Sequence, residues 1–362
     1  MIMRIKKALF LGTLCTAVSG MSLFAQAGVS YAKSAKETTE ASSEEATEVE
    51  TEEETSEEVT YPITIEHAFG ETVIESKPER IATVGWGNQD TPLALGIVPV
   101  GVSAANYGLV TDHKLHLWTD EAFADLGVEE PVVFDDVDGL DFEQISDCNP
   151  DVILAAYSGM TQEDYDTLSQ IAPVIPYKEN PWQTSWREQT IENAEGMGMK
   201  PEGEKKVKEV EDLIAEKLEE YPELEGIPTA FCWISADDFS TFYVYLPTDP
   251  RAAYLLDLGF TLPESVQKLA GESNDFSITV SRENADQLDD IEMMVVYGDE
   301  NLVETLQEDK LMSQIPAIKN GAVVVLDSTS ALAASSTPSI LSIPYEIDEY
   351  LEMFAKAAEN IK

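Results

Sequence analysis

The chain of 362 residues has few basic side chains, 22 against 69 acidic ones, and a formal charge of −47. A nucleic-acid-binding protein needs a basic surface to meet the phosphate backbone, so this balance excludes that class. An anionic membrane surface would repel the chain for the same reason. Disorder throughout is excluded too, because 43% hydrophobic and 8% aromatic residues can form a core. The length predicts two lobes rather than one compact core.

Cysteine and histidine are also scarce, with three of each in the sequence. Three cysteines in so long a chain do not make a disulfide scaffold, and the apolar run around Cys232 indicates a buried thiol. We therefore expect no disulfide between Cys148 and Cys232. A bare-metal site needs several histidines and carboxylates around one ion, and no other histidine is placed to join His113 and His116. We expect no metal site.

The first 32 residues contain no acid and read as an export signal. A basic start (1–7) precedes an apolar run (8–24) and then small residues (25–32), the pattern of a secretory signal peptide. Two alternatives stay open: an uncleaved membrane anchor and a lipid on Cys15, although Leu14 stands where lipoprotein signals have a small residue. In each case we expect the protein at the extracellular face of the cytoplasmic membrane, at the cell surface or in the periplasm.

Residues 33–60 hold 11 glutamates and two lysines, and no aromatic residue, proline or glycine. Such a segment buries too little surface to offset its ordering entropy, and its like charges keep it extended. We predict an acidic disordered linker here. The acidity continues beyond it, because residues 61–362 hold 58 acids and 17 bases, a net charge of −41.

Short apolar runs alternate with helical patterns from residue 80 onward. This rhythm predicts an α/β fold in which each lobe is a mainly parallel sheet with flanking helices. The candidate strands are 81–84, 98–102, 152–155, 174–176, 229–234, 242–245, 278–280, 293–296 and 322–326. The candidate helices are 89–95, 141–147, 161–170, 250–258, 282–289, 301–307 and 343–359.

A different stretch, 203–221, separates the two alternating sections and predicts one long α-helix that joins the lobes. Its buried stripe is expected to contain Val207, Val210, Leu213, Ile214 and Leu218. Gly196, Gly198 and Pro201 are expected to break the chain upstream of it. A cleft between lobes is a favoured ligand site. The predicted parts are an N-terminal lobe (61–190), a connecting helix region (191–225), a C-terminal lobe (226–340) and a C-terminal helix (341–362).

Several short motifs, in this order and spacing, resemble the substrate-binding components of ABC importers for ferric siderophores, haem and cobalamin. The resemblance covers about 61–355. The motifs are 67–72 (HAFGET), 77–81 (KPERI), 84–90 (VGWGNQD), 93–101 (LALGIVPVG), 141–145 (DFEQI), 149–154 (NPDVIL), Arg251, 258–260 (LGF) and 316–321 (PAIKNG).

The resemblance implies two lobes joined by a rigid helix, with limited closure on the ligand. It implies a monomer that captures a ferric chelate outside the membrane and delivers it to the membrane subunits of an ABC permease. It also implies no chemistry on the ligand, so we expect neither an enzyme nor a cofactor. Haem or cobalamin is the alternative ligand within the family.

A pocket for a large chelate needs aromatic walls and a few polar groups, and open α/β sheets bind ligands beyond the carboxyl ends of their strands. Aromatic and polar side chains follow several of the predicted strands. Core packing is the alternative for any one of these aromatics, and we expect four or five of them to line the cleft. The candidate ligand-binding residues are Trp86, Asn88, Gln89, Tyr107, Tyr157, Trp182, Trp186, Arg187, Trp233, Tyr243, Tyr245 and Arg251.

Only four arginines follow residue 60: Arg80, Arg187, Arg251 and Arg282. The resemblance implies Arg and Lys clusters where the ligand is a tricatecholate, and an arginine in the loop before the helix that ends at Pro150 where the ligand is a hydroxamate. Here that loop, 135–139, reads DDVDG. This departure favours a neutral or cationic chelate, such as a ferric hydroxamate. Arg251 is the best candidate for a base in the cleft and Arg187 the second, with a structural ion pair as the alternative for each.

The resemblance further implies that one surface glutamate on each lobe meets arginines of the permease. The matching positions are Glu163 in the first lobe and Glu300 or Glu304 in the second. The alternative for each is an ordinary solvated glutamate.

Two other classes of function remain as alternatives. A secreted glycoside hydrolase would use paired carboxylates and cleft aromatics. With 58 acids after residue 60, carboxylate pairs arise by chance, and the sequence contains no GxSxG, HExxH, P-loop or GxGxxG pattern. A surface adhesin or structural protein does not explain the two alternating sections.

Overall fold

The structure of the protein, a computed structural model, describes residues 59–136, 139–235, 238–299 and 301–361. All of them belong to one compact unit, Glu57–Lys362. The predicted signal peptide (1–32) lies outside the described residues, as does nearly all of the predicted linker (33–60). No helix in the described ranges is long and apolar enough to span a membrane.

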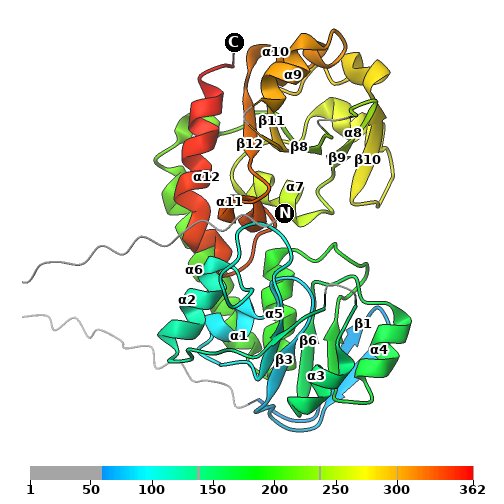
Figure 1. Ribbon diagram of the computed structural model, residues 1–362, viewed down its shortest axis with the longest axis vertical. Helices are drawn as coiled ribbons and strands as arrows, with labels where there is room; N and C mark the ends of the chain where they lie inside the picture. The colour runs from blue at the N-terminus through cyan, green and yellow to red at the C-terminus, as the bar shows by residue number, and fades with distance from the viewer. Residues whose placement is uncertain (1–58, 137–138, 236–237, 300, 362) are drawn as a thin grey trace, which may run out of the picture. The chain divides into compact units, whose positions relative to one another are not determined.

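The N-terminal lobe is built on a five-stranded, fully parallel sheet in the order β5-β4-β3-β6-β7. Figure 1 labels its central strands, β3 and β6. Every residue of β3 and β6 is buried, as expected for the central strands of a parallel sheet covered on both faces. The strand order reverses between β3 and β6, which is where open sheets of this kind form a ligand crevice. The strands are β3 (Ile81–Thr83), β4 (Gly101–Ser103), β5 (Val133–Phe134), β6 (Val152–Ala155) and β7 (Val174–Pro176).

Helices flank this sheet, and an N-terminal hairpin that the sequence analysis did not predict extends the lobe. The hairpin is β1 (Ile63–His67) with β2 (Gly70–Ile74). Helix α2 was also missed, whereas α1, α3 and α4 fall within two residues of their predicted bounds. Capping boxes at Thr161 and Ser185 start α4 and α5. The helices are α1 (Asp90–Ala94), α2 (Leu117–Asp125), α3 (Phe142–Asp147), α4 (Gln162–Leu168) and α5 (Trp186–Gly196).

The connecting helix, α6 (Lys200–Leu218), packs along α5 on one side and α12 (Ser342–Ala358) on the other (Figure 1). It begins three residues before the predicted start at 203. Pro201 does not break the chain as expected but lies in the first turn, where its missing N–H has no helical partner to lose. A Cβ at Gly203 would stand 2.5 Å from the Cβ of Ala194, so this glycine permits the close α5–α6 contact.

The C-terminal lobe is built on a mixed sheet in the order β10-β9-β8-β11-β12. Strands β8, β11 and β12 are parallel, whereas β9 is antiparallel to both of its neighbours. Only residues 234–240 join β8 to β9, and a connection this short allows only the antiparallel direction, because a parallel crossover needs about a dozen residues or more. The strands are β8 (Thr229–Trp233), β9 (Thr241–Tyr245), β10 (Ser277–Ser281), β11 (Met293–Tyr297) and β12 (Val323–Leu326).

The core of this lobe extends into the connector, because Trp186 of α5 and the buried stripe of α6 belong to the same hydrophobic cluster as β8, β11 and α12. The segment predicted as a helix at 282–289 is a 3-10 helix, Arg282–Gln287. The other helices are η1 (Pro222–Leu224), α7 (Pro250–Asp257), α8 (Glu264–Ala270), α9 (Leu302–Glu308), η3 (Met312–Gln314), α10 (Pro316–Asn320) and α11 (Ala331–Ser335).

Candidate ligand-binding site

The loops that follow β3 and β6 meet at the reversal of strand order. The N–H of Trp86 donates to the carbonyl of Tyr157 at 3.2 Å. Gly85 makes this approach possible, with a φ of +84°. A Cβ at Gly85 would stand 2.8 Å from the Tyr157 carbonyl oxygen and 2.9 Å from the Ser158 Cβ. Glycine at this position therefore allows the two loops to approach each other closely.

Asn88 holds these two loops together from behind. Its Nδ2 donates to the carbonyls of Val84 (2.8 Å) and Tyr157 (2.9 Å), and its Oδ1 accepts from the N–H of Tyr157 (3.1 Å) and from Asn193 Nδ2 (3.0 Å). The residue is 0% exposed and lines neither of the two pockets described next. Asn88 thus holds the two loops together and is buried away from both pockets.

The first pocket, here called the aromatic pocket, has a volume of about 430 Å³. Most of its wall is aromatic, in the size range and chemistry of small-molecule sites. The rings of Tyr107 and Tyr297 meet edge to face at 5.7 Å, as do those of Tyr157 and Trp182 at 5.3 Å. Its lining is Trp86, Tyr107, Tyr157, Trp182, Trp233, Tyr245, Asp249, Arg251, Phe276, Tyr297 and Thr337.

Arg251 is the one basic residue in that lining, and it is held by Asp249. Its Nε donates to Asp249 Oδ1 at 2.8 Å, and its Nη2 donates to Oδ2 at 2.6 Å. The guanidinium also lies 3.8 Å above the ring centre of Tyr245. Burial works to lower the pKa of Arg251, but the bonds to Asp249 outweigh it and raise the pKa above its ordinary value. The pair contributes no net charge to the pocket.

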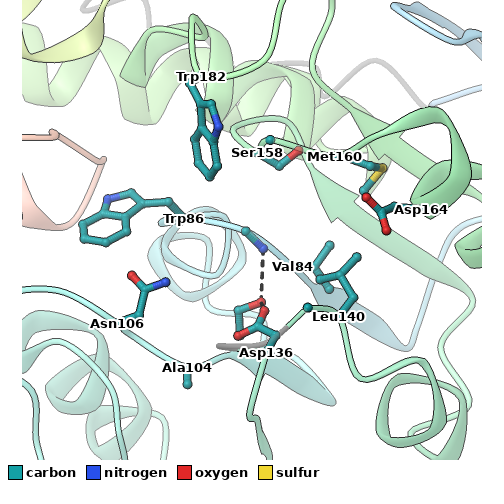
Figure 2. A pocket seen from close by; sticks show the side chains of 14 residues that line it. Val84, Trp86, Ala104, Asn106, Asp136, Leu140, Ser158, Met160, Asp164 and Trp182 are labelled. Carbon is teal, nitrogen blue, oxygen red and sulfur yellow. Dashed lines mark hydrogen bonds between the residues drawn. The ribbon is translucent and has the colours of Figure 1, made fainter.

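The second pocket, here called the acidic pocket, has a volume of about 310 Å³ and shares Trp86 and Trp182 with the first. Asp136 accepts a bond from the Ser103 hydroxyl, which in turn accepts the N–H of Gly85 at 3.1 Å (Figure 2). Burial raises the pKa of Asp136 above its ordinary value. The lining is Val84, Gly85, Trp86, Ser103, Ala104, Asn106, Asp136, Gly139, Leu140, Ser158, Gly159, Met160, Asp164 and Trp182.

Five of the predicted ligand residues lie outside both pockets. Trp186 of α5 packs against α7 and is therefore only 2% exposed. Its Nε1 donates to Asp257 of α7 at 2.9 Å. Arg187 is ion-paired with Asp257 (2.7 Å) and Glu211 (2.6 Å). These contacts realise the structural ion pair that stood as the alternative for Arg187. The five residues are Asn88, Gln89, Trp186, Arg187 and Tyr243.

The structure brings the other seven predicted residues together in the aromatic pocket. They are Trp86, Tyr107, Tyr157, Trp182, Trp233, Tyr245 and Arg251. Four members of the lining are not among the residues predicted from the sequence: Asp249, Phe276, Tyr297 and Thr337. Tyr297 carried a usable signal, because it ends β11 as Trp86 follows β3. Asp249 carried another, because it precedes Pro250 at a helix start, a typical N-cap position.

A buried network behind the aromatic pocket connects the two lobes. Asp90 is 1% exposed and accepts bonds from Trp118 Nε1 (2.9 Å), Thr119 Oγ1 (2.8 Å) and the hydroxyl of Ser339. Ser339 lies just before α12. Burial raises the pKa of Asp90 to about 6. His116 stacks on Trp118 at 4.6 Å, and burial lowers the pKa of this imidazole to about 4.

The predicted docking glutamates are placed as follows. Glu163 is exposed in the first turn of α4, and Glu304 is exposed in the first turn of α9. Glu300 lies outside the described residues. Cys148 and Cys232 are free, and Cys232 is buried.

The periplasmic binding protein family model matches residues 81–329, and the chain belongs to this family. The chain is 48% identical to PiaA of Streptococcus pneumoniae TIGR4, whose crystal structure in complex with ferrichrome has a TM-score of 0.80 and covers 83% of this chain and 100% of that one. The petrobactin-binding protein YclQ of Bacillus subtilis is 25% identical over 306 residues, or 80% of this chain and 88% of its own length. Staphylococcus aureus SirA, solved with staphyloferrin B, shares the fold at 23% identity, with a TM-score of 0.61 and coverage of 83% and 99%.

Proposed function

We propose that the protein is the extracytoplasmic solute-binding component of an ABC importer, and that it captures a ferric hydroxamate siderophore in the aromatic pocket for delivery to a membrane permease. The observation that carries the proposal is an aromatic pocket whose one arginine is already neutralised by a buried aspartate. The 48% identity to a protein solved with ferrichrome supports the same chemical class of ligand.

The charge of the pocket selects among chelates. Three hydroxamate anions balance one ferric ion, so a ferric trihydroxamate is neutral, whereas a ferric tricatecholate is strongly anionic. Because Arg251 and Asp249 cancel, the aromatic pocket offers no surplus positive charge to an anion. Arginine has five N–H donors, and those not directed at Asp249 are suited to the hydroxamate oxygens. The aromatic walls would cover the apolar backbone of the chelate.

The protein is proposed to bind and release its ligand without changing it, as expected of a transport component. A hydrolase is not favoured, because the chain belongs to a family of binding proteins and its sequence contains none of the hydrolase motifs considered above. Chromatography of the chelate before and after incubation with the protein tests this point. An altered chelate would contradict it.

Titration of tryptophan fluorescence tests the ligand class. We expect ferrichrome to quench the emission, because Trp182 is 41% exposed and faces both pockets. Trp182→Phe or Trp86→Phe should remove most of the change. Trp186→Phe is the matched control, since Trp186 is buried away from the pockets and its loss should leave the quenching in place.

The same titration should include a ferric tricatecholate, haem and cobalamin. Binding of haem or cobalamin alone would refute the iron-chelate proposal and leave only the family assignment. Preferred binding of the tricatecholate would refute the charge argument.

Docking to the permease is proposed to use Glu163 on the first lobe and Glu304 on the second. Charge reversal at each, Glu163→Lys and Glu304→Lys, should abolish uptake in cells while chelate affinity stays unchanged. Uptake at the wild-type rate in the double variant would contradict this proposal.

The protein is proposed to act as a monomer, which its mass in solution will test.

A further inference from the structure

The acidic pocket adjoins the aromatic pocket, and the two share the side chains of Trp86 and Trp182. In Figure 2 the Trp182 ring points into the acidic pocket from one side, and Asp136 lies on the opposite side. A single ligand seated against the shared indoles therefore reaches both spaces. The acidic pocket, at about 310 Å³, is large enough for a flexible arm of that ligand.

Asp136 is oriented by a chain of bonds that starts at the backbone. The Gly85 N–H donates to the Ser103 hydroxyl at 3.1 Å, and this hydroxyl donates to Asp136 Oδ2. Ser103 ends β4 and is only 6% exposed, so the carboxylate is fixed at a buried strand end. Lys114, a nearby cation, is bonded to the exposed neighbour Asp135 at 2.8 Å.

The described lining of the acidic pocket contains two carboxylates, those of Asp136 and Asp164, and no lysine, arginine or histidine. Asp164 is held by the capping box of α4, where its Oδ2 accepts the N–H of Thr161 at 2.9 Å. The half-buried carboxylate of Asp136 has no cation beside it in the described lining. An anionic group would be repelled by it, and an apolar group would leave it without a hydrogen-bond partner from the ligand. Indole faces next to a carboxylate favour a cation, and an ammonium group supplies three donors to such a site.

We propose that the acidic pocket receives a protonated primary amine on an arm of the chelate, and that the protein therefore prefers ferric hydroxamates that carry such an ammonium group. Asp136 is the main acceptor for this group, and Asp164 adds to the negative potential. The inference rests on the proposed function, because the arm is placed by a chelate bound in the aromatic pocket.

A matched pair of ligands tests the inference. Ferrioxamine B carries a free ammonium group on a linear ferric trihydroxamate, and its N-acetyl derivative is the same chelate without the charge. We expect the wild-type protein to bind ferrioxamine B about tenfold more tightly, the usual effect of one charge-assisted hydrogen bond. The ratio should shrink at high salt, since the site is only partly buried.

Asp136→Asn should abolish the preference, because it weakens binding of ferrioxamine B about tenfold more than binding of the N-acetyl derivative. Asp135→Asn is the control, because it removes the same charge from the neighbouring exposed residue and should keep the ratio. Ser103→Ala should reduce the ratio partially, because it releases the Asp136 carboxylate, and it supplies a second test if Asp136→Asn has an altered melting temperature.

The outcomes separate the two proposals. Equal wild-type affinity for the two ferrioxamines would overturn this inference while the proposed function stands. An equal loss of preference in Asp135→Asn and Asp136→Asn would assign the effect to the general acidic field and also overturn it. Failure of the wild-type protein to bind any ferric hydroxamate would overturn the proposed function, and the inference with it.

Discussion

The buried carboxylate of Asp90 should make part of the stability of the protein depend on pH in an unusual direction. Burial raises its pKa from an ordinary value of 3.8 to about 6 in the folded state. The folded protein therefore holds this proton more tightly than the unfolded chain does. The contribution to stability is fully present below about pH 4 and is lost as the pH rises through about 6. A difference of about two pKa values corresponds to roughly 3 kcal/mol of unfolding free energy.

Asp90→Asn removes the charge and keeps the shape. With the amide oxygen turned toward Trp118 and Ser339, the amide nitrogen faces the Thr119 hydroxyl, which can rotate to accept. The variant should therefore fold and lose only the pH-dependent part. We expect it to match the wild type within about 1 kcal/mol near pH 4 and to be more stable by roughly 2–3 kcal/mol at pH 7.5.

Urea unfolding of both proteins between pH 4 and 7.5, at constant ionic strength, measures this difference. The wild-type curve alone is not informative, because His116 works in the opposite sense. Burial lowers the pKa of His116 to about 4, so its contribution is present above about pH 6.5 and is lost as the pH falls. Subtracting the two curves cancels His116 and other buried groups. A stability difference that is the same at both ends of the range would refute the reasoning.

Two further predictions concern residues around the site. Trp186→Phe should lower the unfolding free energy by about 1 kcal/mol, because it removes the bond to Asp257, without altering chelate affinity; a loss of affinity in the titration would contradict this. Gly85→Ala should cost at least about 2 kcal/mol more than Gly96→Ala, because both have positive φ but only Gly85 would meet Tyr157. Equal melting curves for the two alanine variants would show that the loops tolerate the side chain.

Local patterns in the sequence predict most of the sheet and a large share of the pocket. The apolar run at 152–155 is β6, buried at every position, as a parallel central strand requires. Side chains that follow such strands meet at one edge of the sheet, and this rule alone selects Trp86 and Tyr157. The antiparallel direction of β9 was also predictable from the sequence, because the connection that precedes it is too short for a parallel crossover. The length of that connection was not used in the prediction.

The rest depends on contacts between distant parts of the chain. Trp182 and Trp186 are four residues apart and look alike in the sequence. The first is 41% exposed at the pockets, whereas the second is 2% exposed against α7. Asn88 resembles a ligand residue in a polar loop, yet its amide is saturated by Tyr157 and Asn193. No local pattern encodes where α7 packs or which backbone groups an amide meets.

The structure shows what the scarcity of arginine means for ligand binding. The four arginines after residue 60 are each bonded within the fold. Arg187 pairs with Asp257 and Glu211, Arg251 with Asp249, and Arg282 with Asp309, while Arg80 donates to main-chain carbonyls. An anionic chelate in the aromatic pocket would have to break the buried Arg251–Asp249 pair to gain a cation there, and separating a buried pair costs several kcal/mol. A neutral or cationic chelate needs no such exchange, which supports the proposed class of ligand.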